Sequence, residues 1–163
     1  PSILEVEGAK DIAIELGSFS KMSSFAGMRM GWAVGNKTLI AALAKVKSQV
    51  DSGMWLPLQR IGAFTLQNPD KEWTEKMLKT YQERRDIIAG HLTKLGLTFS
   101  VPQGSLYLWA KIPESAKDSE AFALELLNEK QIVVTPGTAF GSNGKRYVRV
   151  SICANIEKIG EYF

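Results

Sequence analysis

The chain alternates between segments with the two-residue hydrophobic period of a strand and segments with the longer period of a helix. Residues 11–16 (DIAIEL) alternate apolar and polar side chains, and residues 28–35 (MRMGWAVG) form a second strand-like run. Residues 36–50 have helical composition and begin at Asn36, a favourable N-cap. A further helical segment is predicted over roughly 58–67.

The longest predicted helix begins in the segment NPDKEW and continues to about residue 95. Asn68 suits the cap, Pro69 the first helical position, and the acidic residues that follow suit the positive end of the helix dipole. Apolar side chains then recur at helical spacing, at Trp73, Met77, Tyr81, Ile88, Leu92 and Leu95. This helix therefore has one apolar face, which needs a core to pack on.

After Gly96 the pattern changes to that of a compact α+β unit. It contains four predicted strands, 97–101, 106–112, 131–137 and 147–153, and one helix, 118–130, capped by Asp118 or Ser119. The whole chain is thus predicted to be of the α/β class, with an α+β part at its end.

The predicted elements divide the chain into three parts. Residues 1–50 form the remnant of one domain, residues 51–67 a helical connection, and residues 68–163 a small α+β domain. Two strands and a helix are too few to bury their own apolar surface, so we expect chain outside these 163 residues to complete the first sheet.

Composition places the chain among ordinary globular proteins. It has 163 residues, of which 45% are hydrophobic and 23% charged, with a net charge of only +3. The charges are scattered, which argues against a nucleic-acid or membrane-surface role. Cys153 is the only cysteine and is expected in the core, and there is neither a signal-peptide pattern nor an apolar run that could span a bilayer. We expect a cytoplasmic protein.

Two isolated positive charges stand in the stretch SFSKMSSFAGMRMGWAVG, residues 18–35. Lys21 follows the first predicted strand, where α/β proteins keep their ligand sites. A lysine amine can form a Schiff base with an aldehyde cofactor, whereas Arg29, Ser18 and Ser20 could bind a phosphate. A phosphorylated aldehyde would satisfy all four residues. A solvated Lys21, with Arg29 pointing outward from an edge strand, fits the spacing equally well.

A third candidate charge, Arg149, lies in the middle of the last predicted strand. Alternation places it on the face opposite Val148 and Val150. A desolvated guanidinium needs an anion, so a carboxylate partner is a reasonable expectation. An exposed arginine on the wet face of an antiparallel sheet is the open alternative.

The stretch SFSKMSSFAGMRMGWAVGN resembles the cofactor-lysine signature of the class I/II aminotransferases, pyridoxal 5′-phosphate enzymes of fold type I. The signature places Ser three residues before the Schiff-base Lys and Arg eight residues after it, inside G-x-R-x-G. Here Ser18, Lys21, Gly27, Arg29 and Gly31 match. The signature is long and specific.

The resemblance implies a role for each candidate residue. Lys21 would hold pyridoxal 5′-phosphate as a Schiff base and shuttle a proton at the substrate α-carbon, while Ser18 and Arg29 would hold the cofactor phosphate. Arg149 matches the arginine of the family's R-x-S strand, which binds the substrate α-carboxylate bidentately. Ser20 matches only in its small size. No metal is implied.

Two further segments resemble fold markers of the same family. They are TPGTAFG, residues 135–141, and PQGSLYLW, residues 102–109. Tyr107 could line the substrate pocket, although packing explains it as well. The resemblance extends over about residues 10–155.

The expected function is that of an aminotransferase, which moves an amino group between an amino acid and a 2-oxo acid. The chain resembles the C-terminal portion of such an enzyme: the end of the large-domain sheet and most of the small domain. The cofactor contacts that the family carries upstream of its lysine have no candidate in residues 1–20, so we expect the chain alone to be inactive. The resemblance also implies a homodimer in the full-length parent. Two alternatives stay open: another fold type I enzyme such as a lyase, and the ligand-sensing effector domain of a transcription regulator.

Two other features of the sequence do not indicate a binding or catalytic site. GSNGKR, residues 141–146, lacks the glycine spacing of a phosphate loop and has Arg146 where Ser or Thr should bind magnesium, so an Asn143–Gly144 turn between strands is expected instead. His91 is the only histidine, which leaves neither a metal site nor a Ser-His-Asp triad.

Overall fold

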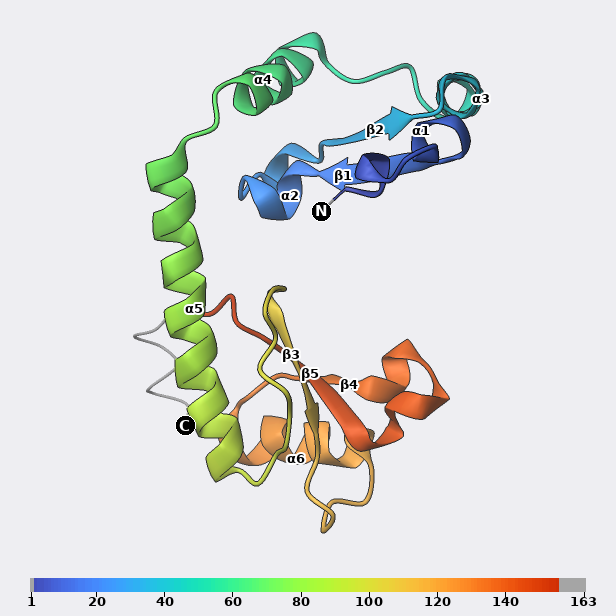
Figure 1. Ribbon diagram of the computed structural model, residues 1–163. Coiled ribbons are helices and arrows are strands. Elements are labelled where there is room, and N and C mark those ends of the chain that lie inside the picture. The colour runs from blue at the N-terminus through green and yellow to red at the C-terminus, as the bar shows by residue number, and fades with distance from the viewer. Residues whose placement is uncertain (1, 156–163) are drawn as a thin grey trace. The chain divides into compact units, whose positions relative to one another are not determined.

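A computed structural model describes residues 2–155. The chain forms two compact units (Figure 1). The units comprise Pro1–Pro69 and Asp70–Phe163. Residues 51–67, assigned to a connection by the sequence, belong to the first unit. The assignment of the units to a large and a small domain stays a prediction.

The first unit contains two strands and several helices. In chain order these are the 3-10 helix η1 (Ile3–Glu5), α1 (Ala9–Ile12), β1 (Ile14–Ser18), α2 (Phe19–Met22), the 3-10 helix η2 (Ala26–Met28), β2 (Gly31–Gly35), α3 (Lys37–Val50) and α4 (Leu56–Gln67).

β1 and β2 form an antiparallel ribbon that is shorter than predicted. Its pairing runs from Ile14 opposite Gly35 to Ser18 opposite Gly31. The predicted strand over 11–16 is wrong at its start, because residues up to Ile12 complete the helical turn α1. The predicted strand over 28–35 is likewise wrong before Gly31, because a 3-10 turn ends at Met28.

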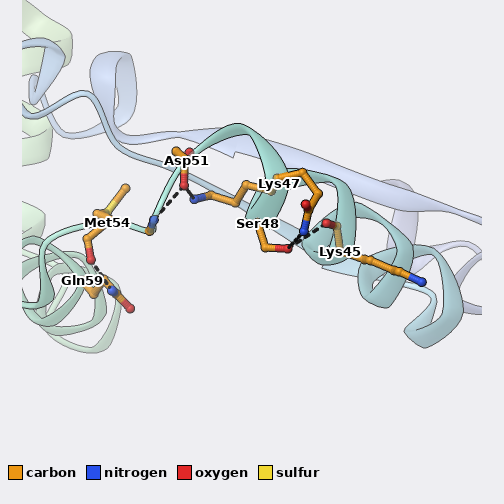
Figure 2. Close-up of polar contacts among 8 residues, drawn as sticks. Lys45, Lys47, Ser48, Asp51, Met54 and Gln59 are labelled. Carbon is orange, nitrogen blue, oxygen red and sulfur yellow. Dashed lines mark hydrogen bonds and ion pairs between the residues drawn. The ribbon is translucent and has the colours of Figure 1, made fainter.

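α3 begins where the sequence predicts. The Asn36 side chain accepts a hydrogen bond from the Leu39 amide at 2.9 Å, which confirms Asn36 as the N-cap. At the other end, Lys47 Nζ lies 2.5 Å from Asp51 Oδ1, which also accepts from the Gly53 amide (Figure 2). These bonds lower the pKa of Asp51, the Lys47 bond most of all.

The second unit is a small sheet with two helices on one face (Figure 1). Its elements are α5 (Lys71–Lys94), β3 (Tyr107–Lys111), α6 (Ser119–Lys130), β4 (Thr135–Pro136), the 3-10 helices η3 (Gly137–Phe140) and η4 (Ser142–Arg146), and β5 (Tyr147–Ser151). The strand order is β3-β5-β4, antiparallel throughout. β5 is therefore central.

Apolar side chains from both helices and the sheet make one core in this unit. Ile88 and Leu92 of α5 and Phe122 and Leu126 of α6 meet the inward side chains of the strands. The strand contributions include Leu108, Ala110, Val148 and Val150, all 6% exposed or less. The apolar stripe predicted for α5 is buried only in the C-terminal half of the helix. In the N-terminal half, Trp73 is 42% exposed.

Several predicted strands in this unit are shorter than expected or absent. The strand over 97–101 is wrong: only Thr98 pairs, in an isolated bridge with Lys111. The strand over 131–137 shrinks to Thr135–Pro136, the two residues of this segment that pair with β5. The Asn143–Gly144 hairpin turn is also wrong, because these residues lie in the 3-10 helix η4.

The helix caps of the second unit correct one prediction and confirm another. Asn68 ends α4, and it is Asp70 whose side chain accepts from the Trp73 amide and starts α5. Of the two predicted caps of α6, Asp118 is the one observed, accepting from the Ala121 amide at 2.9 Å. Cys153, expected in the core, is exposed. None of the helices over residues 2–155 is long and apolar enough to cross a membrane.

Candidate active site

Ser18, Lys21 and Arg29 lie together on the short connection between β1 and β2. Ser18 is the last residue of β1 and caps α2, its Oγ accepting from the Ser20 amide at 3.1 Å. Lys21 lies in this single helical turn and is exposed. The Phe19 amide donates to the Met30 carbonyl at 3.2 Å, so the two ends of the connection are tied to each other. Ser18, Lys21 and Arg29 are thus held on one segment whose two ends are hydrogen-bonded to each other.

Arg29 has an unusual backbone that the sequence did not reveal. It adopts a left-handed conformation, with φ 51° and ψ 47°, which is uncommon for a residue with a side chain. Its guanidinium is exposed, and Nη1 donates to the Ala26 carbonyl at 2.7 Å. Gly27 nearby has open space where a Cβ would stand. The guanidinium therefore keeps further donors on an open surface.

Two buried side chains anchor the connection to α4. Phe19 is 2% and Met30 5% exposed. A Cβ on Gly62 of α4 would lie 2.8 Å from Met30 Sδ and 3.3 Å from Phe19 Cζ. Gly62 thus lets α4 pack closely on the residues that flank Lys21 and Arg29, a contact that sequence patterns did not indicate.

The donor set on this connection fits pyridoxal 5′-phosphate. The exposed Lys21 amine is the nucleophile that an aldehyde needs. Ser18 Oγ accepts one bond, which leaves its O–H free to donate to a phosphate. Arg29 adds a permanently charged guanidinium with unused N–H groups. One amine for the aldehyde and two donors for the phosphate thus lie on a single segment of 12 residues, from Ser18 to Arg29.

Arg149 lies in the second unit, on the central strand of its sheet. Burial along β5 alternates, with Val148 and Val150 buried and Arg149 half-buried on the opposite face, as the sequence predicts. Its neighbours in register are Trp109 on β3 and Thr135 on β4. None of the ion pairs among residues 2–155 involves Arg149, and its carboxylate partner stays a prediction.

The guanidinium of Arg146, three residues before Arg149, has a different set of partners. It donates to the carbonyl oxygens of Pro113, Ala116 and Lys117, and lies 3.5 Å from Glu114. These bonds tie the loop before α6 to the start of β5. Arg146 is therefore a structural tie, whereas Arg149 keeps donors for another partner.

Aromatic rings surround Arg149 instead of an acid. The guanidinium carbon lies 4.4 Å from the Tyr107 ring centroid and 4.7 Å from that of Phe140. Sequence reasoning mentioned Tyr107 only as a possible pocket residue and missed Phe140, because nothing local links η3 to the outer face of β5. The family-like segment TPGTAFG, residues 135–141, was the one available signal.

The two 3-10 helices place Phe140. Gly137 and Gly144 approach so closely that a Cβ on Gly144 would lie 2.0 Å from the Gly137 carbonyl oxygen. Both glycines are buried. Only residues without a side chain allow this approach, which fixes η3 and therefore Phe140 beside β5.

Comparison with known proteins identifies the relatives of this chain. The family model for aminotransferase class I and II matches residues 1–160. The chain is 42% identical over 160 residues to an LL-diaminopimelate aminotransferase of Maridesulfovibrio salexigens, covering 98% of this chain and 41% of that protein. It is 41% identical to the glutamate-pyruvate aminotransferase AlaC of Escherichia coli, covering 98% and 39%.

A solved structure agrees with these relatives. Apo-BacF from Bacillus subtilis superimposes with a TM-score of 0.90 at 41% identity, over 99% of this chain and 41% of that one. The fold is thus a mixed α/β part of an aminotransferase fold. The chain spans about 41% of the length of the relatives that it matches.

Proposed function

The chain belongs to the class I and II aminotransferases, a family that depends on pyridoxal 5′-phosphate, and from this we propose that it is part of an enzyme that transfers amino groups. The reaction is the exchange of an amino group between an amino acid and a 2-oxo acid. The observation that carries the proposal is the tied connection between β1 and β2, which holds an exposed lysine between a serine and an arginine.

In this proposal the first unit binds the cofactor. The Lys21 amine would hold the aldehyde carbon, and Ser18 and Arg29 would donate to the phosphate. When bound, pyridoxal phosphate supplies an electron sink that makes the substrate α-proton removable. Once the substrate amine has replaced it at the aldehyde carbon, the released Lys21 Nζ would carry the proton from the substrate α-carbon to that cofactor carbon.

Arg149 binds the substrate α-carboxylate. A guanidinium offers two parallel N–H donors to a carboxylate, and Arg149 has donors to spare. This contact would set the orientation of the substrate and exclude amines that lack a carboxylate.

The substrates to test first come from the relatives. LL-diaminopimelate and the glutamate–pyruvate pair are the compounds in their names. All of these compounds carry the carboxylate that Arg149 would bind. We further propose that the chain is the C-terminal portion of a longer, homodimeric enzyme.

Transamination by the full-length protein tests this function. With Lys21→Ala, the transfer of an amino group from LL-diaminopimelate or glutamate should fall to background, because the covalent attachment and the proton carrier are both lost. Lys10→Ala, which removes an exposed lysine of the same unit, is the control and should keep activity. Undiminished turnover by the Lys21 variant would refute the proposal.

A further inference from the structure

We infer that Tyr107 and Phe140 are positioning residues for Arg149, holding its guanidinium through ring contacts so that its N–H donors stay available to the substrate carboxylate. The inference rests on the proposed function, in which Arg149 binds that carboxylate. It adds two residues from different elements, β3 and η3, to the substrate site.

The contacts of the guanidinium are of an unusual kind. Both rings lie within cation–π distance, at 4.4 and 4.7 Å from the guanidinium carbon. The one hydrogen bond of its side chain among the described residues runs from Nη2 to Thr135 Oγ1 and is long, at 3.4 Å. The two ring contacts are therefore the main interactions that restrain the Arg149 guanidinium.

A ring contact has a property that an acidic partner would not have. The π system attracts the positive charge without accepting its N–H groups in strong hydrogen bonds. An acid from the chain itself would occupy the same donors that a carboxylate ligand needs. Two rings can thus restrict the guanidinium while leaving most of its five donors free, in contrast to Arg146 with its carbonyl partners.

The rings are themselves supported. The Trp109 ring meets Phe140 edge to face, with centroids 5.6 Å apart, and stacks on Tyr147 at 5.5 Å. Tyr107 is fixed by its place in the strand pairing, opposite Ser151. These four rings and Arg149 form one aromatic cluster on the outer face of the sheet.

Steady-state kinetics of the full-length protein tests the inference. Tyr107→Leu and Phe140→Leu each remove a ring at similar volume, whereas Tyr107→Phe and Phe140→Tyr keep one. We expect each Leu variant to raise KM for glutamate about two- to fivefold, the equivalent of about 0.5 to 1 kcal/mol, with kcat little changed. The conservative variants should stay near wild type.

The matched control removes a ring from another arginine. Tyr81 lies 5.5 Å from the Arg84 guanidinium in the same unit, so Tyr81→Leu deletes a similar contact away from Arg149. Its KM for glutamate should not change. A selective rise in KM for both Leu variants, with rescue by Phe and Tyr, supports the inference.

The outcomes separate the inference from the proposed function. If Arg149→Ala abolishes the preference for donors with a carboxylate but the Leu variants behave like Tyr81→Leu, the positioning role is overturned and the proposed function stands. If Arg149→Ala leaves that preference unchanged, the proposed function of Arg149 itself fails.

A spectroscopic measurement covers the case in which a Leu variant does not fold. Ring currents should shift the Arg149 Nε–H proton of the unmodified 163-residue chain away from the position of a solvated arginine. The conservative variants should retain most of this shift. A proton at the solvated position in the unmodified chain would overturn the inference.

Discussion

Replacing Gly62 by alanine sets two opposing effects of known size against each other. Alanine is a better helix former than glycine by about 1 kcal/mol, which favours the substitution within α4. Its Cβ, however, would stand 2.8 Å from Met30 Sδ and 3.3 Å from Phe19 Cζ. Overpacking of this kind typically costs about 1–3 kcal/mol.

The burial of the two neighbours decides which effect is larger. Met30 and Phe19 are 5% and 2% exposed, so both must shift within the packed interior to make room, which the flexible Met30 side chain does more easily than the Phe19 ring. Subtracting the helix-propensity gain from the packing cost leaves a net destabilisation of up to about 2 kcal/mol, or up to about thirtyfold in the opening equilibrium of the Lys21 connection.

Hydrogen exchange of the full-length protein measures this effect locally. Peptides from α4 and from the segment between β1 and β2 should exchange faster in Gly62→Ala. Gly90→Ala is the matched control, since Gly90 also lies within a helix, α5, but has open space at its Cβ position, so exchange there should slow. If Gly62→Ala also slows exchange, the close packing of α4 on the connection does not exist.

Three further predictions concern the cofactor, the extent of the chain and pH. Arg29→Ala in the full-length protein should weaken retention of pyridoxal phosphate about ten- to hundredfold by equilibrium dialysis, whereas Arg60→Ala, an exposed arginine of α4, should not. The 163-residue chain alone, which spans about 41% of its relatives, should show no turnover with pyridoxal phosphate and an amino donor; measurable turnover would contradict this. The pKa of Asp118 is lowered below 3.8, mainly by the Ala121 amide, so its stabilisation of α6 is present above that value and disappears as pH falls through the lowered pKa. Asp118→Asn, which keeps the cap without titrating, should reduce the acid dependence of helicity measured by circular dichroism, and an unchanged profile would contradict the assignment.

Local sequence signals predicted those elements whose boundaries depend on neighbouring residues. Asn36 and Asp118 cap their helices because a short polar side chain before an apolar run satisfies the free amides of the first turn. The same rule misplaced the start of α5. Asn68 and Asp70 are both competent caps, and only the end of α4 at Gln67 decides between them.

Strand predictions failed where pairing depends on distant chain. Residues 97–101 have a strand-like composition, but only Thr98 finds a partner, at Lys111. Of the predicted strand over 131–137, only Thr135 and Pro136 pair with β5. No local pattern contains this information.

The candidate site divides in the same way. The signature around Lys21 and the alternation around Arg149 were visible in the sequence because each depends on residues close to one another. The rings of Tyr107 and Phe140 beside Arg149 were not, because β3, η3 and β5 meet only in the folded unit. The left-handed backbone of Arg29 also escaped, since most residues with that conformation are glycines.

The most direct test of the account is to locate the covalent attachment of the cofactor. The full-length protein, loaded with pyridoxal phosphate, would be reduced with borohydride, digested and mapped by mass spectrometry. We predict one pyridoxyl label, on Lys21, and its loss in Lys21→Ala without a change in the fold measured by circular dichroism. A label on another lysine, or no label on Lys21 in the loaded protein, would contradict the central claim that Lys21 holds the cofactor.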